Sequence, residues 1–294
     1  MPELPEVETI RRGLMKFIVK KPIKAVEIFE PKMFIGGSST DNFGGLLGAS
    51  IIDIKRYGKC LVIELDNELA LMIHLRMTGQ LIWRGEGEFA AGHPSENFVD
   101  NLPNKQTRIV LSIGEGKLFF NDQRKFGFMK VVKSCDVAKD SFIKKLGKEP
   151  WAMTSEELYA KLQRHAKAPI KAVILDQSII AGLGNIYADE ALFYASIHPE
   201  RRAGTISMVE CEKLLEGARL VMEKSIESGG STMATYVKAD GTRGNYLDNF
   251  AQVFGRTGES CLRCGAKIVK IRVAGRGTHI CPKCQQINNR GRND

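Results

Sequence analysis

Hydrophobic positions recur with two different periods along the 294 residues of the chain. From Glu6 to Val19 the apolar residues lie three or four positions apart, which predicts an amphipathic helix. Pro2 and Pro5 are expected to keep that helix from beginning before Glu6. From Ile23 to Val132, short apolar runs such as CLVIEL and LALMIHLRM are separated by Gly, Asn and Asp, and several alternate with polar residues. This pattern is typical of β-strands and predicts a β-sandwich over residues 1–133.

The pattern becomes helical beyond a linker that we predict at residues 134–150. The segment TSEELYAKLQRH places Thr154 three residues before Glu157, the spacing of a capping box. Residues 151–250 are predicted to form a helical domain that ends in a polar loop, and residues 251–294 a small terminal module. Residues 84–106 are polar and without a period, so we expect a long surface loop there. The fold class predicted is α+β, with two domains.

The positive charge is concentrated at the carboxyl end. The net charge is +9, and the nine basic and two acidic residues of 251–294 leave +7 in that segment. A basic module favours a polyanionic partner, most often nucleic acid, although a solvated basic tail has the same composition. No run of about 18 apolar residues and no apolar leader is present, so we expect a cytoplasmic protein without a membrane span.

Four of the seven cysteines have the spacing of a zinc site. They form two CxxC pairs separated by 16 residues: Cys261, Cys264, Cys281 and Cys284. Four thiolates complete a tetrahedron around one Zn²⁺, and such a site is structural. The spacer fits a β-hairpin with Arg276 at its tip, where the guanidinium either contacts a phosphate or base or is simply solvated.

The amino end carries candidate chemistry. If Met1 is removed, Pro2 becomes a terminal secondary amine, a group of which a useful fraction is neutral near pH 7. A neutral amine attacks an aldehyde-level carbon to give an iminium, and Glu3 beside it is suited to moving protons. The alternative is that these residues only begin a rigid, capped helix.

Two further motifs suit contact with DNA. Asn185 follows Gly-Leu-Gly at a predicted helix start, where backbone N–H groups bind phosphate. Lys167 and Lys171 precede it, so we expect two helix ends separated by a tight turn to clamp one phosphate there. Arg124 and Phe126, in DQRKFG, form a basic and aromatic tip that suits insertion into a duplex, as does Met77 in HLRMTG. The alternatives are an ordinary helix cap for Asn185 and ordinary core packing for Met77 and Phe126.

Taken in order, the motifs PELPEVET, YGKCLVIEL, HLRMTG, DQRKFG, GLGNIYADEAL, VFGRTGESCLRCG and the four-cysteine hairpin resemble the formamidopyrimidine-DNA glycosylase family from end to end. The resemblance implies a β-sandwich, a helix–two-turns–helix domain and a zinc finger. It implies a monomeric base-excision repair enzyme that flips an oxidised purine, such as 8-oxoguanine, from duplex DNA. Such an enzyme then cuts the glycosidic bond and cleaves the strand by β- and δ-elimination.

The resemblance also implies roles for single residues. Pro2 matches the Schiff-base nucleophile, Glu3 the acid of base release, and Glu6 a residue that supports them. Lys59 matches a lysine that contacts phosphate and helps as an acid, and Arg276 matches an arginine that grips phosphate and serves the δ-elimination. The implied DNA contacts are the void-filling Met77, Arg124 and Phe126, the backbone contacts Lys167 and Asn185, and a loop from Ser231 to Tyr236 that caps 8-oxoguanine.

One position departs from the family pattern. NKQTR has Gln106 where a DNA-contacting His is frequent, so we expect a weaker, uncharged contact there. Two rival interpretations exist: an endonuclease VIII-type glycosylase for oxidised pyrimidines, and a non-catalytic zinc protein that binds damaged DNA. Leu4 argues against the first, because that family typically begins PEGPE. The retained Pro2 and Glu3 argue against the second.

Overall fold

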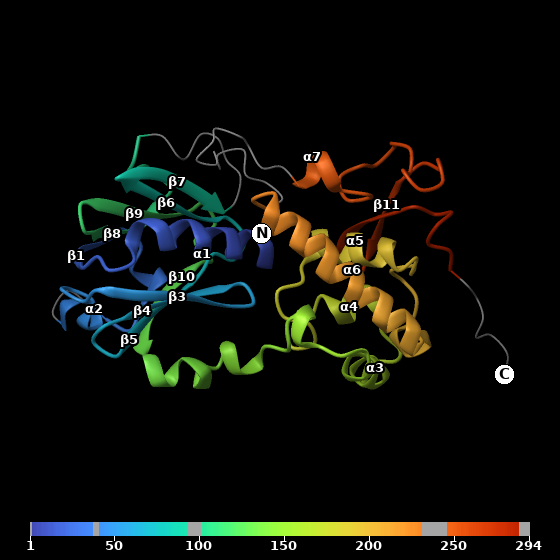
Figure 1. Cartoon of the computed structure of the whole chain (residues 1–294), viewed down its shortest axis with the longest axis horizontal. Helices are drawn as coiled ribbons and strands as arrows, with labels where there is room; N and C mark the ends of the chain where they lie inside the picture. Colours follow the sequence, from blue (N-terminus) through green and yellow to red (C-terminus); the bar gives the residue numbers. More distant parts are fainter. Residues whose placement is uncertain (1, 38–40, 93–100, 231–245, 288–294) are drawn as a thin grey trace. The chain divides into compact units, whose positions relative to one another are not determined.

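The computed structural model describes residues 2–37, 41–92, 101–230 and 246–287, and its chain divides into two units (Figure 1). One unit contains residues 1–144 and 226–245, and the other contains residues 145–225 and 246–294. The predicted linker at 134–150 spans the point at which the first unit gives way to the second. None of the described helices is long and apolar enough to cross a membrane.

The first unit is the predicted β-sandwich, with five strands in each sheet. One sheet has the order β1-β8-β9-β6-β7, from strands β1 (Ile23–Ile28), β6 (Gly79–Gly85), β7 (Gly87–Gly92), β8 (Thr107–Ile113) and β9 (Gly116–Asp122). The other has the order β2-β10-β5-β4-β3, from β2 (Phe34–Ile35), β3 (Ile51–Tyr57), β4 (Cys60–Leu65), β5 (Leu69–His74) and β10 (Phe128–Lys133). All pairings are antiparallel except that of β10 with β2.

Helix α1 (Leu4–Ile18) closes one side of this sandwich. It packs against β3 and β7, the edge strands of the two sheets, and lies between the sheets in Figure 1. Its apolar residues Val7, Ile10, Leu14 and Ile18 join the core that the inner faces of both sheets form. The helix thereby covers two strand edges whose backbone groups would otherwise be exposed.

Two predictions about this unit were wrong in detail. The helix begins at Leu4 rather than Glu6. Pro5 is tolerated because it lies in the first turn, where a backbone N–H has no partner within the helix anyway. The expected loop at 84–106 contains strand β7, which pairs with β6 across a turn at Glu86.

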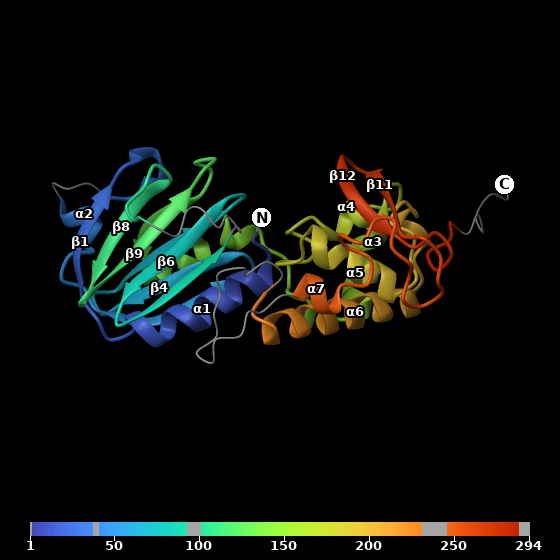
Figure 2. The ribbon, with the colours of Figure 1, turned by 90° about the horizontal axis from the view of Figure 1, so that it is seen from above.

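The second unit holds the predicted helices and the hairpin. The helices are α3 (Ser155–Arg164), α4 (Ile170–Ile174), α5 (Asn185–Tyr194), α6 (Met208–Glu227) and α7 (Tyr246–Phe250). Thr154 and Glu157 form the predicted capping box of α3. Strands β11 (Val269–Val273) and β12 (Arg276–Ile280) form the hairpin, which lies beside α4 and α5 (Figure 2).

Short segments of both units complete the described chain. They are the 3₁₀ segments η1 (Pro31–Met33), η4 (Ser134–Lys139), η5 (Ile143–Lys145), η6 (Pro150–Ala152) and η7 (Ala203–Thr205), together with the four-residue α2 (Asn42–Gly45).

Candidate functional site

The amino-terminal candidates lie at the first turn of α1. Glu3 is the N-cap residue, and it forms a reciprocal capping box with Glu6. In that box the backbone N–H of Glu3 donates to Glu6 Oε2 at 2.8 Å. Glu3 and Glu6 are 3% and 1% exposed, and Pro2 is buried as well. Both residues are therefore held at the start of α1, and Glu6 holds the backbone of Glu3 directly.

Gly230, the residue before the predicted capping loop, lies near the same helix turn. A Cβ built at Gly230 would lie at an ordinary van der Waals distance, 3.5 Å, from Glu6 Cγ, so Glu6 is the neighbour of this glycine. Its φ of +97° is a conformation that glycine adopts without strain. Ser231 and Tyr236, the predicted cap residues, lie outside the described residues.

Lys59 lies in the tight turn between β3 and β4, and its side chain is 5% exposed. Arg56 links this turn to α1. It donates to Glu8 Oε2 at 3.0 Å and to the carbonyl oxygen of Gly58 at 3.2 Å. Burial alone would raise the pKa of Glu8, but hydrogen bonds from Arg11, Arg12 and Arg56 lower it to about 2. Glu8 is therefore ionised at neutral pH and links the helix to the Lys59 turn through Arg56.

His74 is a second buried group near this turn, and the sequence analysis did not single it out. It is 5% exposed and pairs across the sheet with Cys60. Burial and the neighbouring cations Arg76 and Lys59 lower its pKa to about 3, so the imidazole is neutral. Its Nδ1 accepts the backbone N–H of Arg76 at 3.0 Å, which shapes the chain just before Met77.

The three predicted void-filling residues lie on two neighbouring loops of the first unit. Met77 is half-buried in the connection from β5 to β6, whereas Arg124 is exposed in the connection from β9 to β10. The guanidinium of Arg124 lies 4.7 Å from the ring centroid of Phe126, which is 55% exposed. Ordinary core packing, the alternative for Phe126, is therefore wrong, because a core ring would not be half in solvent.

Asp122 connects these two loops, and the sequence analysis missed it. Its carboxylate accepts the backbone N–H groups of Phe126 and Gly127, at 2.9 and 2.8 Å, and the hydroxyl of Thr78. The available signal was chemical: Asp before a turn commonly accepts the amide hydrogen bonds of that turn.

Gln106 is tied to the same loop. Its Oε1 accepts a hydrogen bond from Arg108 at 3.2 Å, and Arg108 Nε donates to the backbone oxygen of Asp122 at 2.8 Å. The oxygen end of the Gln106 amide is thus used within the protein. The NH₂ end is the part suited to a phosphate, as an uncharged donor.

In the second unit, Lys167 is exposed, in keeping with a phosphate contact, but Lys171 is not. Lys171 is 0% exposed, and its Nζ donates to Asp189 Oδ1 at 2.6 Å and to Thr278 Oγ1 at 2.7 Å. The expectation that Lys167 and Lys171 clamp one phosphate is therefore wrong. Lys171 forms a buried ion pair with Asp189 that joins α4 to α5, and its bond to Thr278 joins both helices to the hairpin.

Asn185 begins α5 as predicted, with Gly184 as the N-cap. Its Nδ2 donates to the backbone oxygen of Gly277 at 3.0 Å. Asn185 therefore bonds to the hairpin in addition to beginning the helix. An ordinary helix cap, the alternative for this residue, does not explain that bond.

Arg276 is exposed at the hairpin tip, directly after a two-residue turn. Ala274 and Gly275 form that turn with φ of +47° and +78°, the left-handed conformations that tight hairpins require. The contacts of Lys171 and Asn185 to Gly277 and Thr278 hold the strand immediately beyond Arg276. The tip is thus presented on a firmly anchored strand.

Two acidic residues of α5, Asp189 and Glu190, anchor the terminal segment 251–294, called the zinc module below, to that helix. Asp189 Oδ2 accepts the backbone N–H of His279 at 2.8 Å. Glu190 accepts the backbone N–H groups of Val253 and Phe254 at 2.9 and 2.8 Å. Burial raises the pKa of Glu190, although these amides oppose the shift. The acidic pair in YADEAL gave no hint of this role in the sequence.

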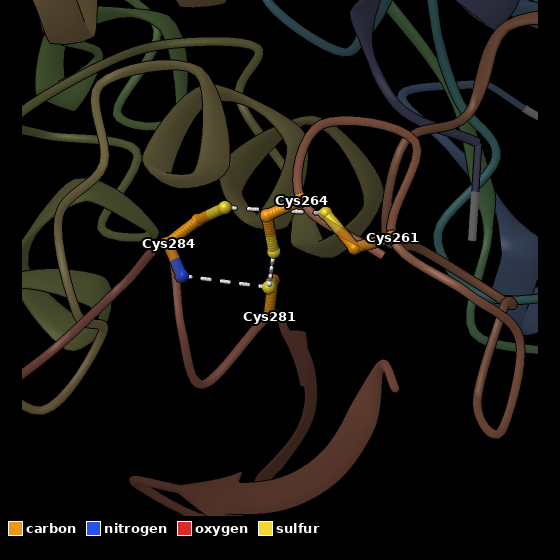
Figure 3. A group of neighbouring side chains, drawn as sticks. All are labelled: Cys261, Cys264, Cys281 and Cys284. Atoms are coloured by element: carbon orange, nitrogen blue, oxygen red, sulfur yellow. Dashed lines mark hydrogen bonds between the residues drawn. The ribbon is translucent and has the colours of Figure 1, made fainter. Parts of the chain in front are cut away.

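The four predicted zinc ligands come together (Figure 3). Their sulfur atoms all lie within 4.8 Å of one another, with Cys264 and Cys281 3.4 Å apart and Cys261 and Cys284 4.0 Å apart. Zn–S bonds of about 2.3 Å in a tetrahedron place sulfurs about 3.8 Å apart, so the cluster fits one Zn²⁺. A backbone hydrogen bond from Ala266 lowers the pKa of Cys264 to about 7, whereas burial raises the pKa of Cys281 and Cys284.

Models of known protein families cover most of the chain. Residues 1–129 match the formamidopyrimidine-DNA glycosylase N-terminal domain, and residues 146–237 match the formamidopyrimidine-DNA glycosylase H2TH domain. Residues 258–287 match the zinc finger found in FPG and IleRS.

Similar proteins match over nearly the whole length. Formamidopyrimidine-DNA glycosylases of an Exiguobacterium species and of Streptococcus pyogenes are 38% and 39% identical, over 97% of this chain and 100% and 99% of theirs. Wild-type Lactococcus lactis Fpg, solved with DNA containing N7-benzyl-Fapy-dG, superposes with a TM-score of 0.84 at 36% identity, covering 97% of this chain and 100% of that one. The same enzyme bound non-covalently to abasic-site DNA gives 0.83 at 36% identity, covering 97% and 99%.

Proposed function

Because this chain belongs to the formamidopyrimidine-DNA glycosylase family, we propose that it excises oxidised purines from duplex DNA and then cleaves the abasic strand. The substrates are 8-oxoguanine and formamidopyrimidines. The observation that carries the proposal is the start of α1, where Glu3 and Glu6 cap each other beside Pro2. A helix start alone needs no buried carboxylate pair, whereas an amine nucleophile needs a proton-transferring group held next to it.

Removal of Met1 makes Pro2 the terminal secondary amine. The neutral nitrogen attacks C1′ as the C1′–N9 bond breaks, and the departing base takes a proton from the enzyme. The sugar ring then opens to leave an iminium on Pro2. Glu3 is the proton carrier in these steps, and Glu6 keeps its backbone in place.

The iminium makes the C2′ proton acidic, so its loss expels the 3′ phosphate. A second elimination then expels the 5′ phosphate. Lys59 and Arg276 are proposed to contact phosphates during these steps, because Lys59 lies in a tight turn and Arg276 directly follows one, and both side chains are basic. Glu8 and Arg56 keep the Lys59 turn at a fixed position relative to α1.

Base flipping costs a few kcal/mol of unstacking. Met77, Arg124 and Phe126 are proposed to offset it by filling the space that the flipped base leaves, which their two adjacent loops support. Gln106 is proposed to contact the DNA backbone near these three side chains.

Lys167 and Asn185 are the proposed backbone contacts of the second unit, and Ser231 to Tyr236 the proposed cap over the base. One Zn²⁺ on the four cysteines holds the hairpin and supplies no chemistry to the reaction. We infer that the protein acts as a monomer in the cytoplasm, where its proposed DNA substrate lies.

The experiment is borohydride trapping on an 8-oxoguanine:C duplex, with the intact mass of the protein measured in parallel. A covalent adduct on a chain that lacks Met1 is expected. Glu3→Gln should bind the duplex but fail to excise the base, and Asp136→Asn, a change at an exposed carboxylate, serves as the control. A chain without Met1 that binds the duplex but forms no adduct would refute the nucleophile assignment. A panel of oxidised pyrimidines run alongside tests the purine preference.

A further inference from the structure

We propose that Asp122 and Thr78 are positioning residues that join the loops carrying Met77, Arg124 and Phe126 into one preassembled wedge. The inference rests on the proposed function, because it concerns how those side chains enter the base stack. Asp122 and Thr78 touch neither the sugar nor the base in this scheme. They act through the backbone of the residues that do.

Asp122 uses both carboxylate oxygens for this purpose. It is the last residue of β9 and is 0% exposed. Its Oδ2 accepts the backbone N–H groups of Phe126 and Gly127, and its Oδ1 accepts that of Arg124 at 3.1 Å. A buried carboxylate that accepts several amide hydrogen bonds fixes the conformation of the loop that supplies them.

Thr78 extends this arrangement to the second loop. Its hydroxyl donates to Asp122 Oδ1 and accepts the backbone N–H of Arg124 at 3.0 Å. Thr78 directly follows Met77 in the chain. One hydroxyl therefore links the backbone beside Met77 to the backbone that carries Arg124.

Both loops end in a glycine that the close packing requires. A Cβ at Gly127 would lie 2.6 Å from Phe120 Cζ and 3.2 Å from Asp122 Oδ2. A Cβ at Gly79 would lie 2.4 Å from the backbone oxygen of Leu75. The conformation of each loop is thus restricted in two ways, by its hydrogen bonds and by the close packing around its glycine. The motifs HLRMTG and DQRKFG therefore end in glycine for the same reason, which is that a side chain at either position would clash with its neighbours.

Fixing the conformation of these loops matters for insertion, because the wedge is exposed before DNA binds. Phe126 is 55% exposed, and an exposed loop that had to order during insertion would lose conformational freedom at that step. Asp122 and Thr78 impose the order during folding. Their loss is expected to slow insertion of the wedge while the amine chemistry at Pro2 stays intact.

The test measures insertion without requiring excision. A duplex carries tetrahydrofuran, an abasic analogue, opposite 2-aminopurine, whose fluorescence reports on stacking against the wedge. Thr78→Val removes the hydroxyl and keeps the shape of the side chain, and Thr78→Ser restores the hydroxyl. Asp122→Asn replaces one acceptor oxygen with an NH₂ group. Asp136→Asn is the matched control, because it makes the same chemical change at an exposed carboxylate on η4.

We expect the fluorescence change to be about tenfold or more slower in Thr78→Val and Asp122→Asn, the effect of losing a hydrogen bond to a charged group. Thr78→Ser and Asp136→Asn should match the wild type. If Asp122→Asn lowers the melting temperature sharply, Thr78→Val carries the test, since it leaves the three amide contacts of Asp122 in place.

Equal rates in Thr78→Val and the wild type would overturn the inference, as would equal slowing in Thr78→Val and Thr78→Ser. The absence of any fluorescence change with wild-type protein would also overturn it, because no wedge would then enter the stack. A wild type that inserts normally but excises no oxidised purine would refute the proposed function and leave this inference standing.

Discussion

Breaking the buried ion pair between Lys171 and Asp189 is expected to destabilise the zinc module strongly. Both side chains are 0% exposed, and Lys171 Nζ lies 2.6 Å from Asp189 Oδ1. Lys171→Met keeps an apolar chain of similar length and removes the charge. Asp189 is then left buried with His279 as its remaining described partner, through the backbone N–H at 2.8 Å and the ring Nδ1 at 3.4 Å. Removing one partner of a buried pair costs about 3–5 kcal/mol, because the other charge stays without compensation.

Lys148→Met supplies the matched control. Lys148 and Glu157 form an ion pair of nearly the same length, 2.5 Å, but their side chains are 52% and 39% exposed. Exposed pairs contribute about 0–1 kcal/mol, because water solvates either charge alone. The two variants thus make the same chemical change and differ in burial.

The assay is urea unfolding followed through zinc release, read by the absorbance of a zinc-binding dye. Zinc release reports on the module that the pair anchors, so it does not average over the β-sandwich. Lys171→Met should shift the free energy of release by at least about 2 kcal/mol more than Lys148→Met. Asp189→Asn added to Lys171→Met should recover part of the loss, since the uncompensated charge is then gone. A shift in Lys171→Met within about 0.5 kcal/mol of the control would refute the reasoning.

Three further outcomes are expected. The pKa of Glu8 lies near 2 instead of 4.5, so its contribution is complete above about pH 4.5 and is lost as the pH falls towards 2. Glu8→Gln should therefore cost about 2 kcal/mol at pH 7, after allowance for solvent around Arg12, and should flatten acid unfolding in that window. Pro2→Gly should give less borohydride adduct than wild type, because the amine becomes primary and loses its ring constraint, with the adduct quantified by gel. Chelation of zinc should weaken duplex binding while circular dichroism of the β-sandwich persists, since the metal holds only the hairpin that presents Arg276.

The sequence by itself determined the parts of the protein that depend on local chemistry. The period of two over the first domain and of 3.6 beyond it gave the fold class, because side-chain direction follows backbone geometry. The zinc cluster followed from spacing alone, since two CxxC pairs and a hairpin leave four sulfurs close together. The Thr154 cap and the start of α5 were also local, and both were predicted correctly.

The tertiary structure decided which charged groups remain available for DNA. Lys167 and Lys171 look alike in sequence, yet one is exposed and the other is neutralised by Asp189 from a different helix. The link from Thr78 to Asp122 spans 44 positions of the chain, so no local pattern predicts it. A side chain's availability depends on which partners long-range packing brings to it, and that information appears only when the strands and helices are assembled.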